Sequence, residues 1–147
     1  PRELRGAHGG RIYGCDDCQE ACPPNRAADR RDKPPQAAAS DEPWVDLVWM
    51  LGLSDSEMLE HFERWYIPRR QARYLRRNAL VALGNVGDGH DPTVAAVLVA
   101  SLGHADPLVR GHAVWATACL GRADLLEAMA PSETDNAVLE ELAVLAR

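Results

Sequence analysis

The feature that most limits the folds open to this chain is a short internal repeat in its second half, called here the echo. One arginine and two alanines, each three residues apart, occur twice with an offset of 34 positions: Arg76, Ala79 and Ala82, then Arg110, Ala113 and Ala116. Residues three apart lie on one side of a helix, and small alanines there allow a neighbouring helix to approach closely. The echo therefore predicts stacked helices, each burying an alanine stripe against the next.

Helix start and stop signals surround the echo. Asp91 and Asp106 each precede a proline, as an N-cap precedes the first helical position, and Gly103 and Gly121 stand where such helices end. The run that begins at Ser54 contains a capping box. We expect helices over 44–51, 54–65, 68 to 84 or 87, 92–103, 107–121, 123–129 and 135–146. No stretch alternates as a strand does, so the predicted fold class is all-α.

The second copy of the echo resembles a HEAT repeat. From Asp106 to Ala113 it reads D-P-x-V-R-x-x-A. The resemblance implies a short HEAT-like helical repeat domain of two to three helix pairs over residues 44–147. An ordinary orthogonal helix bundle is the alternative.

Three of the four cysteines lie within eight residues, in the pattern C-x2-C-x3-C-P formed by Cys15, Cys18, Cys22 and the proline that follows. Bacterial ferredoxins carry C-x2-C-x2-C-x3-C-P, whose last cysteine binds the other cluster of a pair. Ile12 stands where the first cysteine of that pattern belongs. The segment is therefore one ligand short. Because the chain also begins at Pro1, we expect a C-terminal portion of a longer protein, or a subunit that shares clusters with a partner.

Two other uses of these cysteines stay open. With His8 they could form a Cys3His zinc site, although the proline after Cys22 is typical of ferredoxins and no second C-x2-C follows. A disulfide is the weakest option, because three clustered cysteines cannot pair evenly and no signal peptide precedes them.

Composition and the positions of prolines and glycines predict three regions. Residues 1–27 hold the cysteines and form a partial ferredoxin-like domain, residues 28–43 carry charges and prolines and form a linker, and residues 44–147 form the helical domain. With 147 residues, 46% of them hydrophobic, the composition is that of a soluble protein without a membrane-spanning segment, which we expect to be cytoplasmic.

Six arginines and no acidic residue lie between Arg64 and Arg77, although the net charge of the chain is −6. On composition alone this is a solvated helix face. The spacing of Arg69, Arg73, Arg76 and Arg77 nevertheless predicts one side of the third helix that could contact consecutive phosphates. The candidate phosphate-contacting residues are Arg69, Arg70, Arg73, Arg76 and Arg77.

The remaining candidates have ordinary roles. The aromatic residues Trp44, Trp49, Phe62, Trp65 and Trp115 recur with core spacing, and Cys119 is expected to be a small buried hydrophobe. The histidines form no metal-spaced pair, and the chain has no nucleophile–base pair and no phosphate-binding glycine loop. We therefore expect no catalytic residue here.

Taken in order, the cysteine segment with its R-I-Y-G-C-D-D-C-Q start and the later block R-N-A-L-V-A-L-G-N resemble the C-terminal portion of the epoxyqueuosine reductase family. The resemblance implies an oxidoreductase that reduces epoxyqueuosine to queuosine in tRNA. It implies that Cys15 and Cys18 bind one 4Fe-4S cluster and Cys22 another, with further ligands, cobalamin and the catalytic acid held outside this chain. It implies that the five arginines contact the backbone of the tRNA anticodon stem-loop, in a protein that is a monomer when complete.

The chain departs from the family pattern in two places. Pro24 stands where the family usually has tryptophan, which leaves the ligands unchanged, and 64–68 replaces an R-G-S-P-like element, which puts the contact made by that turn in doubt. The competing hypothesis is a cluster-bearing or zinc-bearing helical module with no chemistry of its own.

Overall fold

The computed structural model describes residues 1–31 and 44–145, and all the regular elements in these two ranges are helical. The prediction of an all-α chain is confirmed for this part. Most of the predicted linker, residues 32–43, lies outside the described residues, as do 146–147. The chain divides into two compact units: one joins Pro1–Ile12 with Asp46–Arg147, and the other is Tyr13–Val45.

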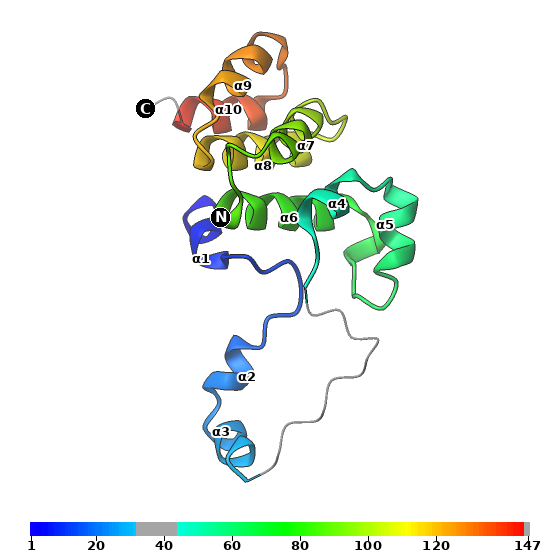
Figure 1. The fold of residues 1–147 in the computed structure, drawn as a ribbon, viewed down its shortest axis with the longest axis vertical. Coiled ribbons are helices and arrows are strands. Elements are labelled where there is room, and N and C mark those ends of the chain that lie inside the picture. The colour runs from blue at the N-terminus through cyan, green and yellow to red at the C-terminus, as the bar shows by residue number, and fades with distance from the viewer. Residues whose placement is uncertain (32–43, 146–147) are drawn as a thin grey trace. The chain divides into compact units, whose positions relative to one another are not determined.

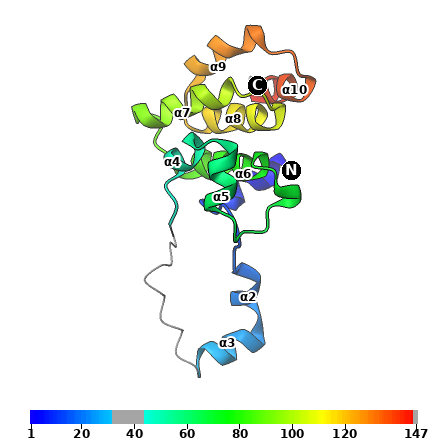
Figure 2. The same cartoon turned by 90° about the vertical axis from the view of Figure 1, so that its right-hand side faces the viewer.

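The first of these, called here the helical unit, contains the elements that stack in Figure 1 and Figure 2. Its α-helices are α1 (Arg5–His8), α4 (Leu47–Gly52), α5 (Asp55–His61), α6 (Arg73–Val86), α7 (Pro92–Leu102), α8 (Pro107–Cys119), α9 (Ala123–Met129) and α10 (Asn136–Leu145). Three 3₁₀ turns accompany them: η1 (Arg2–Leu4), η2 (Pro68–Arg70) and η3 (Ala130–Ser132). Helix α8 is central, since it contacts α6, α7, α9 and α10.

Helices α6 and α8 pack closely, as the echo predicts. The four alanines of the echo are fully buried: Ala79, Ala82, Ala113 and Ala116. The approach is closest at Gly84, where a Cβ atom would lie 2.7 Å from Trp115 Cζ3 and 2.9 Å from Ala116 Cα. Only a residue without a side chain fits between these helices at this point.

The helix starts predicted from capping residues are confirmed. Ser54 N–H donates to Glu57 Oε2 at 2.8 Å, and Glu57 N–H donates to Ser54 Oγ at 3.3 Å, which completes a capping box at α5. Asp91 caps α7 and Asp106 caps α8 through side-chain oxygens that accept backbone N–H groups.

The third predicted helix begins later than expected. Pro68 starts only the short turn η2, because Arg69 and Arg70 adopt left-handed backbone conformations with φ of 55° and 51°. Such residues interrupt a right-handed helix. Helix α6 therefore begins at Arg73, and Arg69 is not on the same helix as Arg73 and Arg77.

Some residues expected in the core lie at the surface. Phe62 and Trp115 are buried, but Trp49 is 44% and Trp44 is 89% exposed. Cys119 is also exposed, because it is the last residue of α8, where that helix leaves the core. The predictions of burial for Trp44, Trp49 and Cys119 are therefore wrong.

The residues at the N-terminus also differ from the predicted division. Residues 1–12 were expected to belong with the cysteines, but they pack on the helical unit. Arg2 and Arg5 form ion pairs of 2.8 Å each with buried Glu141, and Asn85 Nδ2 donates to the Arg5 and Gly9 carbonyls. Across 1–31 and 44–145, no helix is long and apolar enough to cross a membrane.

Candidate functional site

The cysteine segment lies in the unit Tyr13–Val45, on two short helices, α2 (Asp17–Ala21) and α3 (Pro23–Asp29). Cys18 is in α2, and Cys22 joins the two helices as the N-cap of α3, with Pro23 at the first helical position. Asn25 Nδ2 donates to the Gln19 carbonyl at 3.1 Å. This bond ties the start of α3 to α2 and so sets the chain direction at Cys22.

The three clustered thiols suit a metal as donors but do not assemble a ligand set. Cys15 and Cys18 are exposed, Cys22 is half-buried, and none is in a disulfide. Accessible thiolates are ligands for iron–sulfur clusters and zinc. Within the described ranges, however, no three His, Cys, Asp or Glu residues are grouped as a metal ion requires. His8, the fourth ligand of the zinc alternative, belongs to α1 of the helical unit.

Arg76 does not belong to a phosphate-contacting surface. It is only 7% exposed, and its guanidinium donates to Asp55 Oδ1 at 2.9 Å, to the Leu51 carbonyl at 3.0 Å and to the Leu53 carbonyl. All three partners lie in or next to α4 and α5. Arg76 therefore holds the first helices of the unit onto α6.

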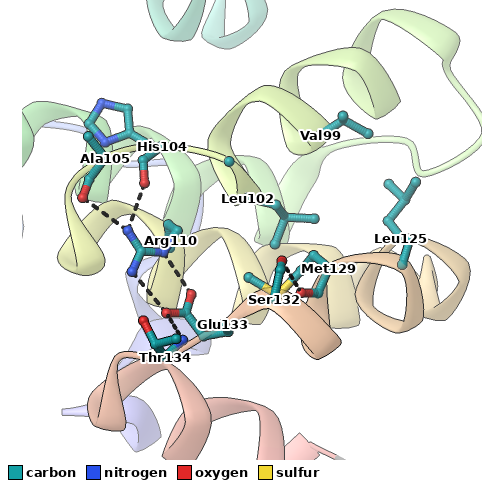
Figure 3. Close-up of a pocket in the computed structure, with 12 residues that line it drawn as sticks. Val99, Leu102, His104, Ala105, Arg110, Leu125, Met129, Ser132, Glu133 and Thr134 are labelled. Carbon is teal, nitrogen blue, oxygen red and sulfur yellow. Dashed lines mark hydrogen bonds and ion pairs between the residues drawn. The ribbon is translucent and has the colours of Figure 1, made fainter.

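Arg110, the echo partner of Arg76, has the same kind of role (Figure 3). It donates to Glu133 at 2.7 and 2.9 Å and to the His104 and Ala105 carbonyls at 2.8 and 3.0 Å. These bonds close one side of a pocket of about 530 Å³, whose other side is formed by apolar residues including Leu102 and Met129. Because the charges in this pocket neutralise each other, it is a structural joint between α8 and the α9–α10 connection.

Arg69 and Arg70 are exposed in η2 but differ in their contacts. Arg70 donates to the Leu59 and Glu63 carbonyls at 2.9 and 3.3 Å, so it caps the C-terminal end of α5. Arg69 forms no ion pair or hydrogen bond with any described residue. Its guanidinium is available to a ligand.

Arg73 and Arg77 lie on either side of the Tyr74 ring, with guanidinium carbons 5.7 and 5.5 Å from its centroid. Arg73 pairs with Asp106 at 3.1 Å. Arg77 instead donates twice to Asn78 Oδ1, at 3.0 and 2.9 Å, and pairs with no carboxylate among the residues described. Of the five predicted arginines, Arg69, Arg70 and Arg77 thus pair with no carboxylate among the described residues, and of these three only Arg70 is held by backbone carbonyls of another element.

Arg77 faces a cavity of about 480 Å³ that no pattern in the sequence predicts. We call it the α1–α6–α8 cavity; its lining includes Arg5, His8, Arg77, Asn78 and His112. These residues come from three helices far apart in the sequence, and no spacing pattern connects them. Burial, reinforced by the charges of Arg5 and Arg77, lowers the pKa of His112 to about 4.

Comparison of the chain with known proteins identifies its relatives. No family model matches the chain. The epoxyqueuosine reductase of Xanthomonas campestris is 36% identical over 118 residues, which are 80% of this chain and 33% of that protein. A solved epoxyqueuosine reductase superposes with a TM-score of 0.75 at 28% identity, over 97% of this chain and 38% of that one. The chain is homologous to epoxyqueuosine reductases.

A second solved epoxyqueuosine reductase contains an epoxyqueuosine-modified tRNA-Tyr stem loop. It matches all of this chain and 40% of its own, with a TM-score of 0.73 at 27% identity. The chain spans about a third of the length of the curated relatives it matches. The homology therefore covers nearly all of this chain but only one part of an epoxyqueuosine reductase.

Proposed function

We propose that this chain is the C-terminal part of an iron–sulfur, cobalamin-dependent epoxyqueuosine reductase, which reduces epoxyqueuosine to queuosine in tRNA. The observation that carries the proposal is the match of 80–97% of the chain to proteins of that name, together with a solved relative that holds a tRNA stem loop. In this proposal the helical unit is HEAT-like and the complete protein is cytoplasmic and monomeric. The cobalamin-binding and catalytic residues lie outside this chain.

The cysteine segment supplies cluster ligands in this proposal. Cys15 and Cys18 bind one 4Fe-4S cluster and Cys22 binds a second, in a ferredoxin-like domain completed by cysteines from elsewhere. The accessible thiols, none of which is in a disulfide, support this role. When bound, the clusters would supply electron transfer.

The cluster role is tested in the full-length protein by Cys18→Ala. Iron and sulfide content should fall, and conversion of epoxyqueuosine-containing tRNA should be lost while tRNA binding persists. Cys119→Ala is the matched control, because Cys119 is an exposed thiol at the end of α8. Full activity in the Cys18 variant would refute the assignment.

The arginines of η2 and α6 contact the tRNA backbone in this proposal, with unequal shares. Arg69 and Arg77 have unneutralised charges and no bond to another element, so they make the main contacts. Arg70 and Arg73 contribute from positions already tied to the fold, and Arg76 makes none. Such contacts position the stem-loop without selecting its sequence.

The RNA role is tested by Arg69→Gln combined with Arg77→Gln. Binding of an anticodon stem-loop should weaken equally for cognate and unrelated anticodons, and the salt dependence should flatten by roughly one to two units of slope. Arg122→Gln removes the same charge at the start of α9, where Arg122 pairs with Asp124, and should leave binding unchanged. A loss confined to the cognate stem-loop would mean that these arginines read bases instead.

The second candidate is a cluster-bearing or zinc-bearing helical module with no chemistry of its own. Iron, sulfide and zinc analysis of the anaerobically purified full-length protein, combined with an assay of epoxyqueuosine conversion, decides between the two. Iron and sulfide with conversion support the reductase, iron and sulfide without conversion support a cluster-bearing module, and zinc supports a zinc-bearing module.

A further inference from the structure

The α1–α6–α8 cavity combines a positive charge, a buried polar atom and enough space for a small ligand. All of its lining belongs to the helical unit, with residues from α1 on one side and from α6 and α8 on the others. Its volume of about 480 Å³ is within the range of small-molecule sites.

The charge in the cavity is positive after the internal ion pairs are considered. Arg5 lines it but pairs with Glu141, which Arg2 also holds. Arg77 lines it as well, and its only described hydrogen-bond partner is the neutral oxygen of Asn78. The guanidinium of Arg77 thus gives the cavity a net positive charge that no described carboxylate cancels.

Two histidines complete the polar lining. His8 Nδ1 is buried and has no hydrogen-bond partner among the described residues. Leaving such an atom unsatisfied is costly, and a ligand in the cavity can reach it if the His8 ring moves. His112 Nδ1 lies 2.8 Å from the Leu108 carbonyl, which can only accept, so this nitrogen carries the hydrogen.

The pKa of His112 is lowered mainly by burial, and the nearby charges of Arg5 and Arg77 add to this effect. The two arginine charges that oppose a proton on His112 would attract an anion, and guanidinium forks bind phosphate oxygens well.

We propose that the α1–α6–α8 cavity is a phosphate-binding site, in which Arg77 supplies the charge, His8 a buried hydrogen-bond partner and Arg5 the supporting cation. The phosphate group could belong to a nucleic-acid backbone or to a small phosphorylated molecule. The chemistry required of the cavity is the same for both. The first source rests on the proposed tRNA contact of Arg77, and the second does not.

The test is a titration of the complete chain with inorganic phosphate, followed by the side-chain NMR signals of His8 and His112 at constant ionic strength with chloride as the balancing anion. Both histidines should shift saturably. Arg77→Gln should weaken binding about tenfold, the loss expected for one charge-assisted contact. Arg77→Lys should retain most of it, and Arg122→Gln should match the unsubstituted chain.

A competing RNA hairpin identifies the source of the phosphate. If the hairpin displaces inorganic phosphate from the two histidines, the site holds a backbone phosphate; if it binds without displacement, or does not bind, while phosphate still shifts them, the site holds a small phosphorylated molecule. The proposal is overturned if phosphate leaves both histidines unshifted, or if it binds the Arg77→Gln chain as well as the unsubstituted one.

Discussion

Glu133 accepts hydrogen bonds from the Arg110 guanidinium and from the backbone N–H groups of Thr134 and Asp135. The bond from Arg110 is the main reason that the pKa of Glu133 is lowered to about 2, against an ordinary value of 4.5. A proton therefore binds this carboxylate less readily in the folded state than in the unfolded one. The resulting stabilisation is complete above about pH 4.5 and is lost as the pH falls toward 2.

This linkage predicts the behaviour of Glu133→Gln. At pH 7 the free energy of unfolding should fall by about 1–3 kcal/mol, because a charge-assisted pair becomes a neutral one. Between pH 4.5 and 2 the unsubstituted chain should lose stability more steeply than the variant, so the difference between them should narrow. Urea unfolding at pH 7 and pH 3 measures both effects. Glu127→Gln, at an exposed position of α9, is the control and should change neither.

The same substitution should destabilise the chain at Arg76 and have almost no effect on stability at Arg69. Arg76→Gln leaves the Leu51 and Leu53 carbonyls without their donor, and the free energy of unfolding should fall by about 2–4 kcal/mol. Arg69→Gln removes no described contact and should stay within about 0.5 kcal/mol of the unsubstituted chain. Urea unfolding at pH 7 compares them, and equal losses would contradict the structural role of Arg76.

The sequence does indicate that Arg76 has a different role from Arg69, but the run of arginines obscures this. Arg76 falls in a run of arginines, which predicts an exposed face, but it also falls in the echo, where its counterpart is Arg110. Both are the fourth residue of their helices and both donate to backbone carbonyls. The repeat position was thus a better guide than the local charge.

At the scale of elements, the helices with local signals were the predictable ones. Asp91 and Asp106 mark their helix starts because a side-chain cap is a contact between residues two apart. Turn η2 had no comparable signal. Pro68 suits the start of a helix, and an arginine in the sequence does not indicate a left-handed backbone conformation such as those of Arg69 and Arg70. Predicting that turn requires knowing that Arg70 reaches back to α5.

The contact between α6 and α8 predicts a strong effect at Gly84. Gly84→Ala places a methyl group against the α8 backbone at Ala116 and should lower the free energy of unfolding by about 1–3 kcal/mol. Gly52→Ala is the control, because a Cβ atom there meets nothing within 4 Å. It should be neutral or slightly stabilising. Thermal unfolding followed by circular dichroism distinguishes them, and equal effects would mean that the two helices separate easily.

At the scale of the whole molecule, the helical unit is built from two stretches of chain that are not continuous. Residues 1–12 pack on α6 and α10 through contacts such as Arg5–Glu141, between residues 136 positions apart. Local patterns carry no information about a pair so distant. The composition of residues 1–27 therefore suggested a single region, whereas the structure assigns residues 1–12 to the helical unit and the residues from Tyr13 onward to the other unit.

This division predicts that residues 1–12 stabilise the rest of the unit. A chain that begins at Asp46 leaves Glu141 without its two arginines and should lose about 2–4 kcal/mol of unfolding free energy. Joining residues 1–12 to Asp46 through a glycine–serine linker, in place of 13–45, should restore most of it. Thermal unfolding of the three chains tests this, and a linked chain no more stable than the short one would show that residues 1–12 contribute little.

Since Ile12 and Asp46 both belong to the helical unit, the cysteine-bearing segment between them is a loop with two anchored ends. The entropy lost on closing such a loop depends on how its chain prefers to separate those ends. Any event that changes this preference, including the binding of a metal by the thiols, must therefore change the melting temperature of the helical unit, although the three clustered cysteines lie outside it. The thermal stability of the helices would then report whether these cysteines are oxidised or hold a metal.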